Sequence, residues 1–188
     1  MKIWIDFENT PQVHFLLAIK EMLNNSNEFV LTARDVFETV KLLEKKTDLP
    51  IYALGTRHGK KLPQKILLML QRFFIVLNNI ENFDLSISCG SESAIWSSKL
   101  KNKRSIAFGD NDTARQWTYS KFVDFCFFPG AIDKDILIRQ GIKQSKLYQY
   151  NGYKEDIYIA NYTPDDRFLA TIPFQNYVLV RPENIYAN

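Results

Sequence analysis

Short apolar runs alternate with amphipathic stretches along most of the chain. The runs are rich in β-branched and aromatic residues and stop at polar residues or glycine, which is typical of buried strands. The predicted strands are residues 3–5, 28–32, 51–54, 85–89, 105–108, 123–128 and 147–150. The predicted helices carry apolar residues on one face and are residues 12–24, 36–46, 63–79, 91–100, 114–119 and 133–140. This alternation predicts an α/β fold, a Rossmann-like parallel sheet with helices on both faces.

Polar residues mark where three of these helices begin. Asn9 or Thr10 is placed to cap the first helix, and Asp35 is placed to cap the second. Ser91 or Ser93 begins the helix that ends at residue 100. Each cap predicts a hydrogen bond from a backbone N–H of the first helical turn to the side chain of the capping residue.

The character of the sequence changes after Tyr150. The residues that follow are polar and aromatic, and a run that again resembles a strand and its loop comes near the end. We expect an N-terminal Rossmann-like domain at residues 1–150, a hinge at 151–175, and the first strand of a truncated C-terminal domain at 176–188. On this interpretation the sequence is a fragment of a two-domain protein.

Composition narrows the functional classes. The chain has 188 residues, of which 46% are hydrophobic, so it can bury a core and is not a disordered protein. Its net charge of +3 is too small to predict a nucleic-acid partner. Cys89 and Cys126 lack metal-ligand spacing, which favours reduced thiols and a cytoplasmic location. Residues 67–77 are apolar but too short to span a bilayer, so we expect no transmembrane segment and leave peripheral membrane contact open.

Polar residues cluster directly after five of the predicted strands. In a parallel sheet these loops converge at one edge, which is where α/β proteins bind ligands. The clusters are Asp6, Glu8, Asn9 and Thr10; Thr32 and Arg34; Arg57, His58 and Gly59; Gly90 to Ser93; and Asp110 to Asp112. The carboxyl edge of the sheet is therefore the predicted site.

The chemistry of these loops suits sugars and phosphates. The run from Gly90 to Ser93 offers hydroxyls and backbone N–H groups at the start of a helix, which can hold a phosphate or a sugar hydroxyl. The chain contains neither a Walker A loop nor G-x-G-x-x-G. Arg34 and Arg115 can neutralise phosphates. Asp110 and Asp112 can coordinate a metal, act as a base or cap the following helix, and capping is favoured for Asp112. The two histidines, His14 and His58, lack metal-ligand spacing.

These motifs together resemble the domain-of-unknown-function family 354, whose fold is similar to that of glycosyltransferase-B (GT-B) proteins. The resemblance spans nearly the whole chain. It rests on Trp4-Ile5-Asp6-Phe7-Glu8-Asn9-Thr10-Pro11, Leu31-Thr32-Ala33-Arg34-Asp35, Ser88-Cys89-Gly90-Ser91-Glu92-Ser93-Ala94, Tyr150-Asn151-Gly152-Tyr153-Lys154-Glu155-Asp156 and Val180-Arg181-Pro182-Glu183. It implies a distant similarity to UDP-N-acetylglucosamine 2-epimerases and to GT-B glycosyltransferases, in which two domains face a cleft and the first contributes acceptor or catalytic groups.

The chain departs from these patterns at three positions. Gln12 stands where the family often has histidine after Thr-Pro, and Cys89 stands where it usually has histidine before the glycine. Ser91 stands where the epimerases carry an aspartate, which argues against epimerisation by their mechanism.

The hypothesis that follows is the acceptor-side half of a GT-B-like sugar-nucleotide enzyme, with glycosyl transfer in surface-polysaccharide synthesis. Its partners would be a nucleotide sugar as co-substrate and a carbohydrate or lipid-linked acceptor, with no nucleic acid and no metal site. The candidate catalytic residues, which would take a proton from an acceptor hydroxyl, are Asp6, Glu8 and His14. The candidate substrate-binding residues are Asn9, Thr10, Arg34, His58, Gly90, Ser91, Glu92, Ser93, Asp110, Asp112, Arg115, Asn151, Gly152, Lys154, Glu155, Arg181 and Glu183.

Two other interpretations remain open. The run Ile5-Asp6-Phe7-Glu8-Asn9 also resembles the start of PIN-like metal-dependent ribonucleases, in which Asp6, Asp110 and Asp112 would gather around a cation that activates water. The chain can also be a non-catalytic binding remnant that keeps the fold without turnover.

Overall fold

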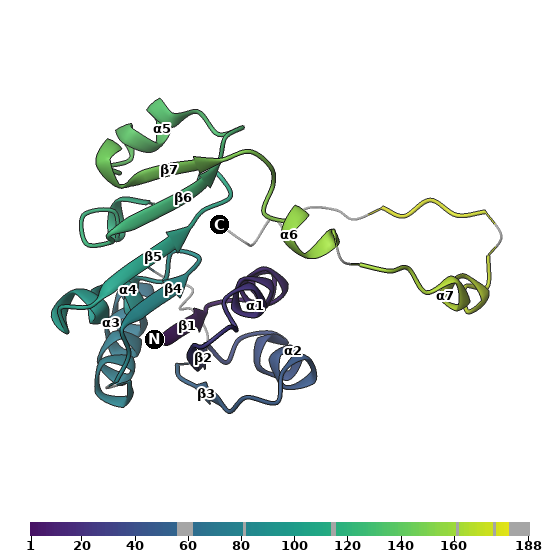
Figure 1. Ribbon diagram of the computed structural model, residues 1–188, viewed down its shortest axis with the longest axis horizontal. Coiled ribbons are helices and arrows are strands. Elements are labelled where there is room, and N and C mark those ends of the chain that lie inside the picture. Colours follow the sequence, from purple (N-terminus) through teal and green to yellow (C-terminus); the bar gives the residue numbers. More distant parts are fainter. Residues whose placement is uncertain (56–61, 81, 114–115, 161, 175, 181–188) are drawn as a thin grey trace.

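Seven parallel strands form a single sheet in the order β3-β2-β1-β4-β5-β6-β7 (Figure 1). The computed structural model describes residues 1–55, 62–80, 82–113, 116–160, 162–174 and 176–180. The strands are β1 Lys2–Phe7, β2 Glu28–Ala33, β3 Ile51–Ala53, β4 Leu85–Ser88, β5 Arg104–Phe108, β6 Phe125–Pro129 and β7 Leu147–Tyr150. Each lies where the apolar runs predicted it, so the predicted α/β fold is confirmed.

Helices cover both faces of this sheet, and the last helix lies away from it (Figure 1). They are α1 Gln12–Met22, α2 Thr39–Lys46, α3 Leu62–Asn79, α4 Glu92–Leu100, α5 Lys134–Arg139, α6 Asp156–Ile159 and α7 Asp166–Ala170, with 3₁₀ turns η1 Gln116–Thr118 and η2 Gln144–Lys146. From β1 to β3 the chain crosses the sheet in one direction, and from β3 to β5 it returns in the other. Because such crossovers are right-handed, α1 and α2 lie on one face, and α3 and α4 on the opposite face (Figure 1).

The reversal also fixes where a ligand can bind. β1 pairs with β2 on one side and with β4 on the other, so the loops after β1 and β4 lead away to opposite faces of the sheet. A crevice opens between such loops at the carboxyl ends of the strands. In this fold the crevice lies beside Asp6 of β1 and Ser88 of β4, which are paired in register.

The start of α1 differs from its prediction. Neither Asn9 nor Thr10 caps the helix with its side chain. The N–H groups of Gln12 and Val13 donate instead to the backbone carbonyls of Asn9 and Thr10, at 3.2 and 3.1 Å. The Thr10 hydroxyl lies 3.1 Å from that of Thr39, so packing against α2 takes the oxygen that the cap would have used.

The start of α2 was also predicted wrongly. The helix begins at Thr39 rather than at residue 36, and Asp35 does not cap it. Phe37 has a φ of 52°, a left-handed conformation that no α-helix continues through. The prediction started the helix at Val36 because this residue is apolar. Val36 is indeed buried, but it lies in the turn before the helix.

The starts of α4 and α5 follow the expected chemistry. Ser91 caps α4 by accepting a hydrogen bond from the Ala94 N–H at 3.3 Å, so the first of the two serines was the right choice. The Asp133 carboxylate accepts from the Asp135 N–H at 2.8 Å at the start of α5. Both caps place a polar oxygen on donors that a helix leaves unpaired.

β1 is the most deeply buried strand. Trp4, Ile5 and Phe7 are fully inaccessible to solvent, because side chains on alternate sides of the strand meet helices on both faces. The Trp4 indole N–H donates to the Thr32 hydroxyl at 2.8 Å, which satisfies its one polar atom. The strand that carries Asp6 is therefore held rigidly.

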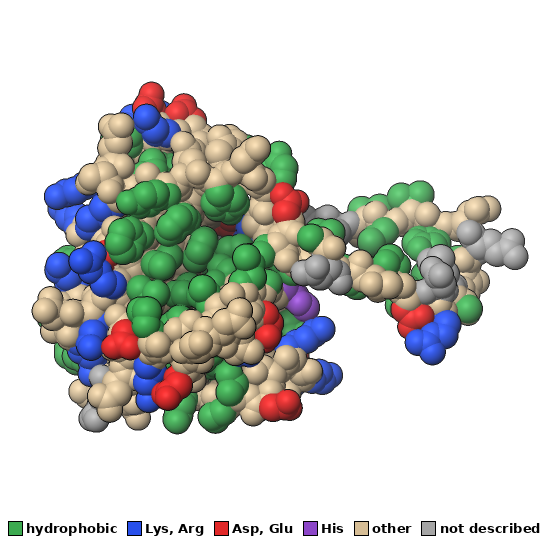
Figure 2. All heavy atoms as spheres, in the orientation of Figure 1, with side chains coloured by type: hydrophobic (Ala, Val, Ile, Leu, Met, Phe, Trp, Pro, Cys, Tyr) green, Lys and Arg blue, Asp and Glu red, His purple; other side chains and the backbone are tan. Residues whose placement is uncertain are grey.

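One half of the sheet is left open on the face that carries α1. Phe108, Phe127 and Tyr148 stack across β5, β6 and β7 with ring centroids 5.3 and 5.2 Å apart. Figure 2 shows hydrophobic side chains gathered over these strands. We call this area the front apolar face; beside α1 it holds an apolar cavity of about 500 Å³.

The segment after β7 returns toward α1. α6 contacts α1, and the ring of Tyr158 lies 5.8 Å from that of His14. Residues 176–180 are outside the sheet, and residues 181–188 lie beyond the described part of the chain. The expected division into a domain, a hinge and the first strand of a second domain remains a prediction.

Candidate active site

Asp6, near the end of β1, is the centre of a buried ionic cluster. Its carboxylate is inaccessible to solvent and receives two hydrogen bonds from Arg72 of α3: Nη2 to Oδ1 at 2.7 Å and Nη1 to Oδ2 at 3.0 Å. The Ser91 hydroxyl donates to Oδ2 at 2.6 Å, and the Thr32 hydroxyl donates to Oδ1. Asp6 thereby joins β1, β2, α3 and the start of α4, and has no surface left for a ligand.

Burial and ionic pairing shift the pKa values of Asp6 and Arg72 in opposite directions. Burial alone would raise the pKa of Asp6, but the charge of Arg72 and the hydrogen bonds from Arg72, Ser91 and Thr32 hold that pKa below its ordinary value. Burial alone would lower the pKa of Arg72, and the charges of Asp6 and Glu8 raise it. Both groups are ionised at neutral pH, so the pair is a fixed structural element.

Glu8 extends the cluster toward solvent. Its Oε1 accepts from Arg72 Nη1 at 3.0 Å and from Arg34 Nη2 at 3.2 Å, and it lies 3.3 Å from the Ser91 hydroxyl, which donates to Asp6. Its backbone N–H donates to Gln12 Oε1 at 2.9 Å, which fixes the loop after β1. Glu8 is therefore a carboxylate held in place by two guanidinium groups, with one side facing the cavity described next.

A polar cavity of about 380 Å³ lies at the carboxyl edge of the sheet. This is within the range of about 300–1,000 Å³ that ligand pockets usually show. Its wall comes from the loops after β1, β4 and β5, from the segment that holds η1, and from the segment after β7. The lining residues are Glu8, Asn9, Pro11, Gln12, Cys89, Gly90, Glu92, Phe108, Gly109, Asp110, Asn111, Gln116, Tyr119 and Lys154.

Glu92 lines this cavity from the first turn of α4. It is half-buried, and its Oε1 accepts a hydrogen bond from the Thr118 hydroxyl at 3.0 Å. Burial raises the pKa of Glu92 to about 7, and the negative charge of Glu8 adds to the rise. A carboxyl group with a pKa near 7 can both accept and return a proton at neutral pH.

Gly90 lets the chain turn sharply between β4 and α4. Its φ is 82°, and a Cβ there would lie 3.0 Å from the ring of Tyr119. Tyr119 is buried beside the cavity, and its hydroxyl donates to Gln116 Oε1. A side chain at residue 90 would displace Tyr119 from the cavity wall, so glycine is required for both backbone and space.

Lys154 closes the cavity on the side of the connector. Its ammonium group donates to the Asp110 carboxylate and lies 3.9 Å from Glu155 Oε1. Burial would lower the pKa of Lys154, but the hydrogen bond and charge of Asp110 raise it. Lys154 therefore stays cationic and ties the segment after β7 to the loop after β5.

Two other lining groups bear on the chemistry. The Asn9 Oδ1 atom is buried and has no hydrogen-bond partner among the described residues, so a ligand donor there would satisfy it. Burial raises the pKa of the Cys89 thiol to about 12. The thiol is therefore protonated at neutral pH and is not a thiolate nucleophile.

The structure brings some of the predicted site residues together and leaves others apart. Those that line the cavity are Glu8, Asn9, Gly90, Glu92, Asp110 and Lys154. Those that support it from the buried cluster are Asp6, Arg34 and Ser91. Those that lie elsewhere are His14, Thr10, Ser93, Asp112, Asn151, Gly152 and Glu155. The positions of His58, Arg115, Arg181 and Glu183 fall outside the described residues.

The residues outside the cavity have other surroundings. His14 is exposed on α1 against Tyr158, whereas Ser93 is buried below the start of α4. Asn151 and Gly152 line the apolar cavity of the front apolar face.

Several residues that form side-chain hydrogen bonds in this region were not among the predicted site residues. They are Arg72, Gln12, Gln116, Thr118 and Tyr119. A signal for Arg72 was present, since it is a lone cation within the apolar run of residues 66–77. A charge in such a run is expected to find a buried partner. The segment around residues 116–119 carried no comparable signal.

The three aspartates of the ribonuclease interpretation do not form a ligand set. Both oxygens of Asp6 are occupied by Arg72, Ser91 and Thr32. Within the described ranges, no group of three His, Cys, Asp or Glu side chains is arranged to hold a metal ion. The described residues therefore do not provide the cluster of three aspartates that the ribonuclease interpretation requires.

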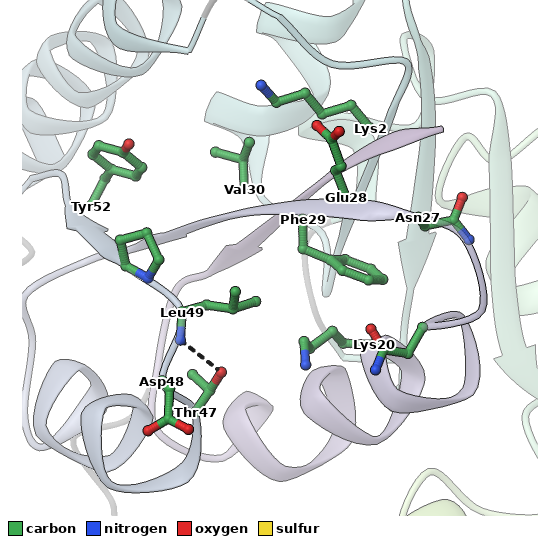
Figure 3. A pocket seen from close by; sticks show the side chains of 12 residues that line it. Lys2, Lys20, Asn27, Glu28, Phe29, Val30, Thr47, Asp48, Leu49 and Tyr52 are labelled. Atoms are coloured by element: carbon green, nitrogen blue, oxygen red, sulfur yellow. Dashed lines mark hydrogen bonds between the residues drawn. The ribbon is translucent and has the colours of Figure 1, made fainter.

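A larger cavity, of about 660 Å³, lies at the amino edge of the sheet (Figure 3). Lys20 of α1 points into it beside Phe29, and its ammonium group lies 5.7 Å from the Phe29 ring centroid and 2.7 Å from Glu21 Oε1. None of the predicted site residues lines this cavity. It is at the end of the strands where α/β sheets do not usually bind ligands.

A family model described as "Protein of unknown function (DUF354)" matches residues 1–186. No curated protein matches the sequence. The match confirms the family resemblance that the sequence motifs indicated.

Several solved structures are similar in fold. UDP-N-acetylglucosamine 2-epimerase from Rickettsia bellii has a TM-score of 0.64 and 12% identity, over 90% of this chain and 48% of that chain. Anabaena Alr3699/HepE in complex with UDP-glucose has a TM-score of 0.59 and 14% identity, over 81% and 44%. Acinetobacter baumannii MurG has a TM-score of 0.56 and 13% identity, over 68% and 40%. The chain spans less than half the length of each, and the likeness establishes a GT-B-like fold.

Proposed function

The chain belongs to the DUF354 family, and from that premise we propose that it forms the acceptor-side half of a GT-B-like sugar-nucleotide enzyme that transfers a glycosyl group in surface-polysaccharide synthesis. One observation carries the proposal. Three carboxylates, those of Glu8, Glu92 and Asp110, meet at a single cavity on the carboxyl edge of the sheet. The fold it shares with epimerases and with Alr3699/HepE, which was solved with UDP-glucose, supports the substrate class.

The charge of the cavity favours an acceptor over a nucleotide diphosphate. Carboxylates accept hydrogen bonds from sugar hydroxyls, whereas they repel phosphate groups. Lys154 is already paired with Asp110, and Arg72 is held by Asp6 and Glu8. The described cations that border the cavity are thus partly neutralised, and a hydroxyl-rich neutral saccharide suits the remaining acceptors.

Glu92 is the group best suited to take the acceptor proton. Asp6 is buried within its cluster, and Glu8 Oε1 accepts from both Arg72 and Arg34. Glu92 faces the cavity and accepts one side-chain hydrogen bond, from Thr118. In the proposed step the acceptor oxygen forms a bond to the anomeric carbon of the sugar, and its proton passes to Glu92. The bond from that carbon to the nucleoside diphosphate breaks, and the diphosphate leaves with the electron pair.

The test is an activity screen with matched variants. The full-length gene product is incubated in the cytoplasmic pH range with nucleotide sugars and with carbohydrate and lipid-linked acceptors, and products are detected by mass spectrometry. Glu92→Gln should lower kcat by about 10²–10⁴-fold, which is the usual contribution of a general base. Glu44→Gln, on the exposed surface of α2, should leave kcat unchanged.

The screen also separates the alternatives. Saccharide binding in the cavity without turnover, measured by ligand-observed NMR, would favour a non-catalytic binding protein. If the panel shows no binding and no turnover, the proposal is overturned. Turnover that survives Glu92→Gln but is lost in Glu8→Gln would move the base to Glu8.

A further inference from the structure

Helix α3 is apolar on two sides. Its inner side carries Val76, which packs with Ile80 against Trp4 of β1. Its outer side carries exposed apolar residues spaced by about four, so they form one stripe along the helix. These residues are Ile66, Leu67, Leu70 and Phe74. Leu67 is 65% exposed and Phe74, two turns further along the helix, is 55% exposed. A contiguous exposed stripe of large apolar side chains is a mark of an interaction surface.

Aromatic rings continue this stripe beyond α3. Phe74 lies 5.1 Å from Phe73, Phe73 lies 5.8 Å from Trp96 of α4, and Trp96 lies 6.3 Å from the exposed Phe122, measured between ring centroids. We call the exposed members the α3 apolar surface: Ile66, Leu67, Leu70, Phe74 and Phe122. It lies on the opposite face of the sheet from α1 and α2, and so apart from the front apolar face.

The charged residues in α3 and in the segment directly before it are all basic. Residues 55–80 contain no Asp or Glu, and their five basic residues are Arg57, Lys60, Lys61, Lys65 and Arg72. Arg72 is buried against Asp6, whereas Lys65 is exposed on α3 and Lys121 is exposed next to Phe122. Residues 57–61 lie outside the described part of the chain.

We propose that the α3 apolar surface binds the surface of an anionic phospholipid bilayer. A helix with exposed Leu, Ile and Phe side chains and basic neighbours has the composition of helices that lie in the membrane interface. Basic residues add attraction to anionic headgroups. No described α3 residue lines any of the three cavities described above, so none of these cavities offers a protein partner a groove on this surface.

The mode of contact is peripheral. In the described ranges, no helix combines the length and apolar character needed to cross a bilayer. The inner side of the same helix carries Arg72, which holds Asp6 and Glu8. Docking through α3 would therefore fix the orientation of the polar cavity relative to the lipid surface. The inference depends on α3 and stands whether or not the proposed function holds.

Vesicle sedimentation with the full chain tests the proposal. We expect binding to phosphatidylcholine vesicles that contain phosphatidylglycerol and much weaker binding to pure phosphatidylcholine. Leu67→Glu and Phe74→Glu should each weaken binding by on the order of tenfold or more, since each removes one apolar side chain from the contact. Lys65→Gln should weaken binding about fivefold, and only on the anionic vesicles. All three residues are exposed, and thermal unfolding checks that the variants remain folded.

Tyr148→Glu is the matched control. Tyr148 is a large exposed residue of the front apolar face, and its substitution should leave vesicle binding unchanged. Loss of binding in Tyr148→Glu, with none in Leu67→Glu or Phe74→Glu, would overturn the proposal and assign the contact to the other face. Equal sedimentation of the wild type with and without vesicles would overturn it as well.

Discussion

Glu92 shows how the surroundings of one side chain set its chemistry. Its carboxyl group accepts a single side-chain hydrogen bond, from Thr118, and faces the charge of Glu8 in a half-buried position. Asp6 is more deeply buried, yet it is paired with Arg72 and its pKa is lowered. The two carboxyl groups are thus shifted in opposite directions, which is a common arrangement where one acid is structural and another exchanges protons.

A pH-dependent stability follows from Glu92. Its pKa in the folded state, about 7, lies above its ordinary value of 4.5, so its stabilising contribution is full below pH 4.5 and is lost as pH rises through 7. Glu92→Gln should therefore gain stability relative to the wild type between pH 4.5 and pH 8, by up to about 3 kcal/mol. Urea unfolding at the two pH values measures this difference.

Asp6 does not obscure the measurement. Its lowered pKa gives a contribution that is present above its ordinary value near 3.8 and is lost as pH falls through the folded-state pKa, below the window of the experiment. Glu44→Gln, an exposed substitution on α2, is the control and should show no change between the two pH values. The same stability difference for Glu92→Gln at both pH values would contradict the assignment.

At the scale of elements, the ion pair between Asp6 and Arg72 fastens α3 to β1. The guanidinium group makes two hydrogen bonds to Asp6, and its Nε donates to the carbonyl of Leu54 at 3.0 Å. Arg72→Met would leave Asp6 buried without a cation, and the free energy of unfolding should fall by about 3–5 kcal/mol. Chemical denaturation measures the change.

The partner substitution sharpens this prediction. Because the cost arises from an unpaired buried charge, adding Asp6→Asn to Arg72→Met should restore part of the lost stability. Arg139→Met, on the exposed surface of α5, should change stability by less than about 0.5 kcal/mol. Additive losses from Asp6→Asn and Arg72→Met would show that the two groups are not coupled.

The elements themselves were largely predictable. β7 and α3 were placed to within one residue at each end. For α3 the reason is that apolar residues recur over several turns of the helix. α2 was misplaced because the left-handed turn at Phe37 leaves no mark in the apolar pattern. The predicted side-chain cap of α1 does not form because the Thr10 hydroxyl hydrogen-bonds instead with that of Thr39, which is 29 residues away in the sequence.

The site was predictable only in its location. The loops after the strands do meet at the carboxyl edge, as the parallel sheet requires. The roles depend on contacts between distant residues: Arg72 is 66 residues from Asp6, and the Thr118 hydroxyl reaches Glu92 across 26. Periodicity and loop composition carry no information on such pairings, so Asp6 was placed among the catalytic candidates and Arg72 was not considered.

At the scale of the whole molecule, Lys154 ties the segment after β7 to the sheet. Lys154→Met removes the hydrogen bond to Asp110, so the segment that carries α6 should detach from the rest of the molecule more often. Amide hydrogen exchange of residues 151–160 should rise about threefold to tenfold, as expected for the loss of one charge-assisted hydrogen bond. Mass spectrometry of the exchanged peptides measures the change.

The control for this prediction lies nearby. Lys143→Met, in an exposed turn before η2, should leave exchange in residues 151–160 unchanged. Uniformly faster exchange across the sheet would indicate global destabilisation rather than release of the connector. Unchanged exchange in Lys154→Met would show that the contact between α6 and α1 holds the segment without Lys154.

The central place of β1 has a consequence for synthesis on the ribosome. β1 is made first, yet its edge toward β4 cannot pair until residues 85–88 exist. At a translation rate of about 5–20 residues per second, this edge stays open for about 4–16 s while Ile3, Trp4 and Ile5 have left or are leaving the exit tunnel. Nascent chains of this protein therefore expose their most deeply buried strand for longest, which makes it a natural target for ribosome-associated chaperones.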